Sequence, residues 1–137
     1  LPLFAGLIID ESQRPVETAH VGEDAVYVID DAGFLRHVEA EQIDRQVLLI
    51  LREQILANRD MVTEGALQML GSDDLFTKAL IDSSISNIDQ HLDRVIEQGL
   101  PTEARQWLGM LGFRVIVDYR GEVIGLDQPG VEGPNEN

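Results

Sequence analysis

The chain of 137 residues lacks cysteine, so disulfide bonds, thiolate chemistry and cysteine-based metal sites are excluded. This composition fits a reducing compartment, and we expect a cytoplasmic location. No apolar stretch of the sequence approaches the length needed to span a membrane. The first ten residues, LPLFAGLIID, carry no basic residue and end in an acid, so we do not expect a signal peptide there.

Basic residues are also scarce. The chain has 10 basic and 25 acidic residues, which gives a formal charge of −15, and its one lysine is Lys78. Such a field repels nucleic-acid phosphates and anionic membrane surfaces, so we expect neither nucleic acid nor a membrane as a partner. Aromatic residues make up 5% of the chain. Trp107, Phe113 and Tyr119 are expected in the core rather than on a base-stacking surface.

Two regions of the sequence have the composition of β-strands. The first forty residues are rich in β-branched and aromatic residues, and turn-forming clusters such as DESQRP and DAG interrupt them. The short spacings favour hairpins, so this region predicts an antiparallel meander. The expected strands cover residues 3–10, 16–21, 25–30 and 34–38, and a further hairpin is expected at 113–119 and 122–126.

The middle of the chain predicts helices, because good helix formers dominate it. Asn58 and Gly65 are the candidate interruptions of its first half. Ser72 is the expected N-cap of the next segment, and the polar residues 82–87 predict a kink within that segment. The expected helical segments are 41–70, 72–98 and a short helix between Pro101 and Gly112.

These elements predict an α+β fold: an N-terminal antiparallel β-meander, a central segment of three to four helices, and a C-terminal β-hairpin that joins or flanks the sheet. The length suits one domain, expected over residues 1–127, with a flexible tail at 128–137. The segments VIDDAGFL and VIVDYRGEVI both place an Asp three residues before a Gly. They predict two similar hairpin turns, in which the Asp accepts backbone N–H groups and the Gly adopts a positive φ.

Sequence patterns typical of enzymes and metal sites are absent. The chain has no HExxH, no G-x-S-x-G and no phosphate-binding glycine pattern, and its acid clusters do not fit an EF-hand. No cofactor is therefore expected. His37 and Glu39 fall on one face of an extended segment, and His20 on a neighbouring strand would be a third ligand. These three residues are the candidates for a metal or small-molecule site between the sheet and the helices, and surface histidines are the alternative.

The segment VLLIL at residues 47–51 places apolar side chains on more than one side of its predicted helix. On a helical wheel most apolar residues of this helix fall within an arc of about 180°. Leu49 and Leu56 do not, because they lie on the opposite side, near Arg45 and Arg52. A helix that is apolar on two sides is expected to be buried on two sides.

Two explanations account for this second apolar stripe. A second subunit could cover it, or residues 75–98 of the same chain could do so. We favour a homodimer, because cyclic dimers are the commonest oligomers, and we predict an interface at Leu49, Leu56, Arg45 and Arg52. The sequence thus predicts a non-enzymatic, acidic, homodimeric protein-interaction or regulatory domain, with a further protein partner. The alternative is a small-molecule or metal-binding protein, or an enzyme, with a site around His37 and Glu39.

Overall fold

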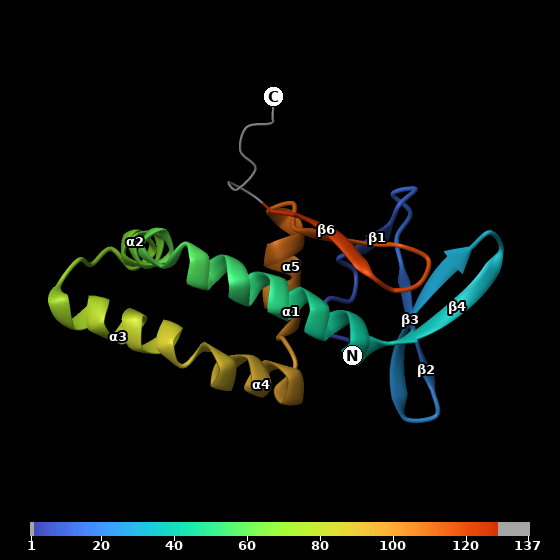
Figure 1. Cartoon of the computed structure of the whole chain (residues 1–137), viewed down its shortest axis with the longest axis horizontal. Coiled ribbons are helices and arrows are strands. Elements are labelled where there is room, and N and C mark those ends of the chain that lie inside the picture. The colour runs from blue at the N-terminus through green and yellow to red at the C-terminus, as the bar shows by residue number, and fades with distance from the viewer. Residues whose placement is uncertain (1, 129–137) are drawn as a thin grey trace. The chain divides into compact units, whose positions relative to one another are not determined.

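The computed structural model describes residues 2–128. Within them lie five helices and two three-stranded sheets (Figure 1), which confirms the predicted α+β class and its order of strands, helices and C-terminal hairpin. The chain forms two compact units. The strand unit comprises the residues up to Val47 and those from Gln98 onward, and the helical unit comprises Leu48–Glu97. One domain over 1–127 stays a prediction, and all but residue 128 of the predicted tail lies outside the described residues.

The strand unit contains both sheets. The meander consists of β2 (Glu17–Val21), β3 (Asp24–Asp31) and β4 (Phe34–Glu39), and the second sheet consists of β1 (Ile8–Asp10), β5 (Arg114–Val117) and β6 (Val123–Asp127). The meander therefore has three strands. The strand expected at 3–10 is shorter than predicted, because only β1 forms there, and it belongs to the second sheet. This strand runs parallel to β5, and the carbonyl of Leu7 accepts the N–H of Val115 at 2.8 Å. A partner so distant along the chain leaves no local pattern in the sequence.

Two hairpin turns of the strand unit have the predicted Asp-based geometry. The Asp30 carboxylate accepts the backbone N–H of Gly33 at 2.7 Å, and Asp118 accepts two backbone N–H groups of its own turn at 2.9 Å. The glycines that follow, Gly33 and Gly121, have φ values of +94° and +87°. The similar sequence segments VIDDAGFL and VIVDYRGEVI therefore form two similar turns, as predicted.

The core of the strand unit includes the first part of α1 (Ala40–Ala57). Ile43 and Val47 of this helix are fully buried, which agrees with the predicted inward face of α1. The largest fully buried side chains of the described chain all belong to this unit: Ile8, Tyr27, Ile29, Ile43, Val47, Val115 and Val117. Tight packing of this kind is the main source of stability in a small fold.

A buried polar network ties the N-terminal segment to this core. The hydroxyl of Tyr27 donates to Asp44 at 2.6 Å, and the N–H of Leu3 donates to the other carboxylate oxygen at 3.1 Å. The N–H of Phe4 donates to the Tyr27 oxygen at 3.1 Å. Burial raises the pKa of both Tyr27 and Asp44, because it disfavours the charged form of each.

The helices follow one another along the chain: α1, then α2 (Arg59–Leu70), α3 (Leu75–Ser86), α4 (Ile88–Gln98) and α5 (Thr102–Met110). The predicted interruptions at Asn58 and within 82–87 are confirmed, since Asn58 and Asn87 separate successive helices. Both interruptions are complete, which raises the helix count to five. None of the described helices has the combination of length and apolar character needed to cross a membrane.

The predicted cap of α3 was wrong. Asp74 is the N-cap, and its carboxylate accepts the N–H of Thr77 at 2.6 Å. Ser72 instead belongs to the end of α2, where Gly71 adopts a left-handed conformation and the N–H of Ser72 donates to the carbonyl of Leu67. Ser72 is engaged in this C-terminal capping arrangement, so the cap of the next helix falls two residues later.

Candidate functional site

The helical unit exposes many large apolar side chains. Only Leu48, Leu67 and Ile85 of its large apolar residues are buried. Those that are exposed come from three of its helices: Leu49, Met61, Met69, Leu70, Leu75, Phe76 and Leu80. Exposed apolar side chains concentrated in this way are typical of surfaces that bind a partner.

One continuous apolar face lies on α3. Leu75, Phe76 and Leu80 are 83%, 74% and 54% exposed, and Ala79 is exposed between them. With 100° of rotation per residue these four side chains span an arc of about 140°, and we call this face the α3 stripe. The opposite side of α3 carries Ile85, which is buried. The helix therefore packs through one face and presents the other to solvent.

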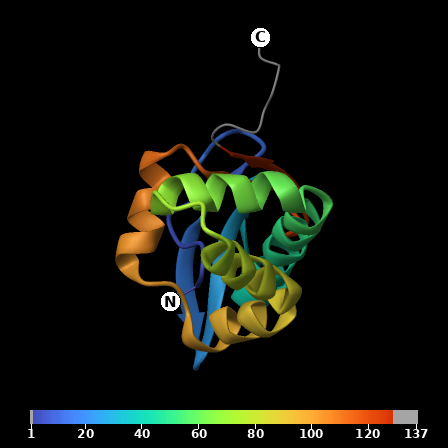
Figure 2. The same cartoon turned by 90° about the vertical axis from the view of Figure 1, so that its left-hand side faces the viewer.

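A groove lies between α2 and α3. These helices cross at a steep angle, because α2 is seen end-on where α3 is seen from the side (Figure 1) and lengthwise in the view turned by 90° (Figure 2). The groove consists of two adjoining hollows of about 600 and 700 Å³ that share Glu64, Leu75 and Lys78 as lining residues. We call this feature the α2–α3 groove.

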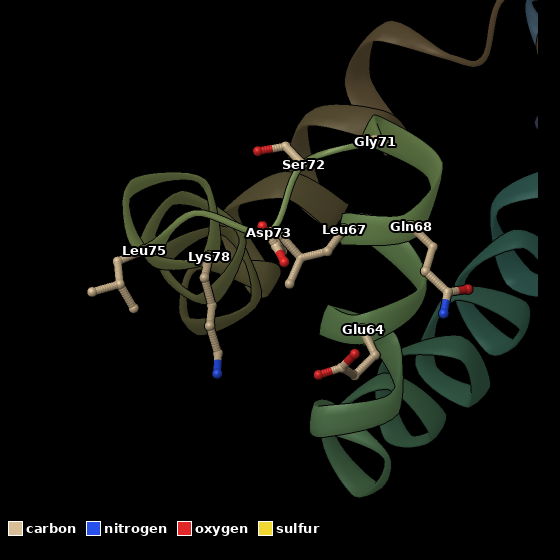
Figure 3. Close-up of a pocket in the computed structure, with 8 residues that line it drawn as sticks. All are labelled: Glu64, Leu67, Gln68, Gly71, Ser72, Asp73, Leu75 and Lys78. Carbon is tan, nitrogen blue, oxygen red and sulfur yellow. The ribbon is translucent and has the colours of Figure 1, made fainter.

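Most charged side chains of the groove have no ion-pair partner among the described residues. Glu64 of α2 and Lys78 of α3 project toward the same space between the helices (Figure 3). In the described part of the chain, the ion pairs include neither of them, nor Asp60 and Asp73, which also line the groove. Asp82 pairs with Arg59. The groove therefore has three unpaired acids and one unpaired base.

Two arginines form ion pairs between helices of this unit. Arg59 at the start of α2 donates to the carboxylate and the carbonyl of Asp82 and to the hydroxyl of Ser86 at 2.6 Å, both on α3. Arg52 of α1 donates to Asp89 of α4 at 2.6 Å. The hydrogen bond from Arg52 lowers the pKa of Asp89, and the carboxylate in turn raises the pKa of Arg52. Exposed pairs of this kind contribute little stability.

The structure places the predicted interface residues of α1 as follows. Leu49 is 56% exposed, and Leu56 is partly buried. Arg45 pairs with Glu41 one turn earlier, and Arg52 pairs with Asp89. The 75–98 segment therefore reaches α1 at Arg52, but it leaves most of Leu49 uncovered. A second subunit at Leu49 stays a prediction.

The structure does not bring the three candidate metal ligands together. His20 lies opposite Ala25, and His37 lies opposite Val28. Ala25 and Val28 are three residues apart on β3, so they point to opposite faces of the sheet, and the two histidines do as well. Glu39 shares the face of His37, and all three residues are exposed. Residues 2–128 contain no group of three or more His, Asp or Glu side chains able to hold a metal ion.

The α2–α3 groove and the exposure of the α3 stripe were not predicted from the sequence. The helical spacing of polar and apolar residues on α2 and α3 could have indicated both features. The groove residues recur at one helical face on α2 (Asp60, Thr63, Glu64, Leu67, Gln68, Gly71) and on α3 (Leu75, Lys78, Ala79, Asp82). The four-residue connection at 71–74 makes these helices neighbours. The position of the single lysine on this face was a second indication.

Comparisons of the chain with protein-family models, with curated proteins and with solved structures gave no match.

Proposed function

We propose that this chain is a non-enzymatic protein-interaction domain that self-associates as a homodimer through the α3 stripe. The observation that carries the proposal is the exposure of Leu75, Phe76 and Leu80 on one face of one helix. Burying a large apolar side chain contributes about 1.5–3 kcal/mol relative to leaving it in water. Three such side chains from each of two subunits supply a sizeable driving force for association.

A two-fold symmetric contact suits this face. In such an interface the same patch is used by both subunits, so one self-complementary helix is sufficient. α3 has 12 residues, which corresponds to a length of about 18 Å. Met69, Leu70 and Leu49 of the same unit are also exposed and could extend the contact.

The charge of the chain opposes association. Each subunit has a formal charge of −15, and two such subunits repel each other. Added salt screens this repulsion and strengthens an apolar contact at the same time. We therefore expect the dimer to become tighter as the ionic strength rises, which would distinguish it from association through ion pairs.

The alternative function around His37 and Glu39 has no observation in its favour. Both side chains are exposed, and the third candidate, His20, lies on the other face of the sheet. A catalytic or metal site requires several convergent groups. Self-association is therefore the proposal that the described residues support best.

Sedimentation velocity tests the proposal. The wild-type chain should sediment as a dimer at about 100 μM, and Phe76→Glu should shift it to a monomer by weakening association at least about a hundredfold. Gln90→Glu adds the same charge to an exposed position on α4 and should leave the dimer intact. Leu49→Glu separately tests whether the interface reaches α1. A wild type that stays monomeric at every salt concentration would overturn the proposal.

A further inference from the structure

We propose that the α2–α3 groove is a docking site for a basic amphipathic helix of another protein. This interaction goes beyond self-association, because its decisive residues lie in the groove and not on the α3 stripe. Phe76 and Leu80 do not line the groove, and Glu64 and Asp60 are not part of the stripe. Leu75 and Ala79 border both surfaces.

The shape of the groove suits a short helix. Its lining runs along one face of α2 from Asp60 to Gly71, nearly the whole length of that helix. That length corresponds to about 18 Å, or about three turns of a bound helix. α3 forms the other wall through Leu75, Lys78 and Asp82. Grooves between helices commonly accept an amphipathic helix that inserts side chains at i, i+3, i+4 and i+7.

Apolar contacts are available along the groove. Leu67 projects from α2 toward α3 (Figure 3) and is buried. Leu75 is strongly exposed at the groove's edge, and the side chain of Ala79 leaves room beside it. Large aliphatic side chains of a bound helix would cover Leu75 and contact Leu67. Burial of this apolar surface would supply the affinity.

Charge determines which helix fits. Asp60, Glu64 and Asp73 line the groove with no ion-pair partner among the described residues, and Lys78 is the one base in the lining. Arg and Lys side chains along the flanks of a bound helix would meet these carboxylates. Such complementarity raises the association rate and selects against acidic partners. The occupant is therefore basic on its polar side.

A second copy of this chain does not offer such a helix. The formal charge of the chain is −15, and its single lysine lies in the groove itself. Two of the four arginines and lysines of the helical unit, Arg52 and Arg59, are already paired with acids. The complement of the groove must therefore come from a different protein.

A synthetic peptide provides the probe. It is a fluorescein-labelled helix former of about 15 residues, made of Leu and Lys with the leucines at i, i+3, i+4 and i+7. Its control has the same composition in scrambled order, because any cationic peptide is attracted to an acidic protein. Fluorescence anisotropy at about 0.15 M salt should show the patterned peptide binding about tenfold more tightly than the scrambled one.

Variants of the full chain locate the binding site. Glu64→Lys should weaken binding of the patterned peptide about tenfold. Asp93→Lys makes the same change on the exposed surface of α4 and should alter binding by less than about twofold. Lys78→Gln should tighten binding about threefold, because it removes the one positive charge from the groove. All three positions are exposed, and circular dichroism checks that helix content is unchanged.

Two results would overturn the proposal: equal binding of the patterned and scrambled peptides, or equal weakening by Glu64→Lys and Asp93→Lys. Phe76→Glu separates this proposal from the proposed dimer. Peptide binding by that variant at wild-type strength or tighter supports the groove, and tighter binding is expected if the wild type dimerises, because Leu75 borders both surfaces. Loss of peptide binding in Phe76→Glu would assign the peptide to the α3 stripe instead, and would also overturn the groove.

Discussion

The strand unit has a closed apolar core, whereas the helical unit buries few of its large apolar side chains. The strand unit encloses seven large side chains completely, whereas the helical unit buries only Leu48, Leu67 and Ile85 among its large apolar residues. The strand unit also exposes large apolar side chains, but it does so beside a complete core: Val21, Phe34, Leu35, Trp107, Met110, Leu111, Tyr119 and Ile124. The expectation that Trp107 and Tyr119 lie in the core was therefore wrong, and of the three aromatic residues expected there only Phe113 is buried. The difference indicates that folding free energy is concentrated in the strand unit.

The polar contacts follow the same division. In the strand unit, Asp44 and Tyr27 form a buried network that fixes backbone as well as side chains. In the helical unit, the bonds of Arg52 and Arg59 lie at the surface, where water and salt weaken them. The helices of this unit are therefore held with less free energy, and a partner that covers them would stabilise them.

The largest expected effect comes from removing core volume. Ile29→Ala in the strand unit should lower the free energy of unfolding by about 3 kcal/mol, because Ile29 is fully buried. Leu75→Ala in the helical unit should change it by less than about 0.5 kcal/mol, because Leu75 is 83% exposed. Urea unfolding followed by circular dichroism measures both, at a protein concentration at which the chain is monomeric. Similar losses for the two variants would contradict the comparison.

A smaller effect is expected at Asp44. Asp44→Ala should cost about 2 kcal/mol at neutral pH, because the Tyr27 hydroxyl and the Leu3 N–H both lose their acceptor. Burial raises the pKa of Asp44 above 3.8 in the folded state. The folded chain therefore binds a proton more readily than the unfolded chain, and this residue's contribution to stability falls as the pH rises through the raised pKa.

Asp44→Asn isolates that pH dependence. The variant cannot ionise, so urea unfolding between about pH 4 and 7 should show a less negative slope of stability against pH than the wild type shows. Asp31→Asn, at a partly exposed position in the same unit, serves as the control. An identical slope in the wild type and in Asp44→Asn would show that burial of this carboxyl does not govern the response.

The smallest effect is expected at the cap of α3. The N–H of Thr77 lowers the pKa of Asp74 below 3.8. The contribution of the Asp74 carboxylate to folding stability is therefore fully present above pH 3.8 and is lost as the pH falls through the lowered pKa. This pH dependence is opposite in direction to that of Asp44. Acid should thus lower the amide protection factors of α3, which compare measured exchange rates with intrinsic rates at the same pH, and Asp74→Asn, which keeps a capping oxygen, should reduce that sensitivity. Asp73→Asn is the charge-matched control, and equal sensitivity in both variants would contradict the assignment.

Local features of the fold could be predicted from the sequence. The strand segments, the two Asp-based turns and the interruptions near Asn58 and Asn87 each depend on a few neighbouring residues. Such features follow from turn chemistry and periodicity, which a single sequence contains.

Features that depend on distant residues could not be predicted. The pairing of β1 with β5 and the bond from Tyr27 to Asp44 join segments with no shared local pattern. The proposed convergence of His20 with His37 failed for the same reason, since the register against β3 determines which face each side chain takes. The α2–α3 groove required the crossing of two helices, and periodicity alone does not give that geometry.

The pairing of β1 with β5 also sets an order for folding during translation. Ile8 of β1 lies beside Val115 of β5, so this sheet cannot close until Val115 has left the ribosome. The helices between them need only near neighbours and form earlier, because local contacts form faster than distant ones. For that interval the nascent chain displays Leu75, Phe76 and Leu80 without a finished core elsewhere, which is when chaperone protection matters most.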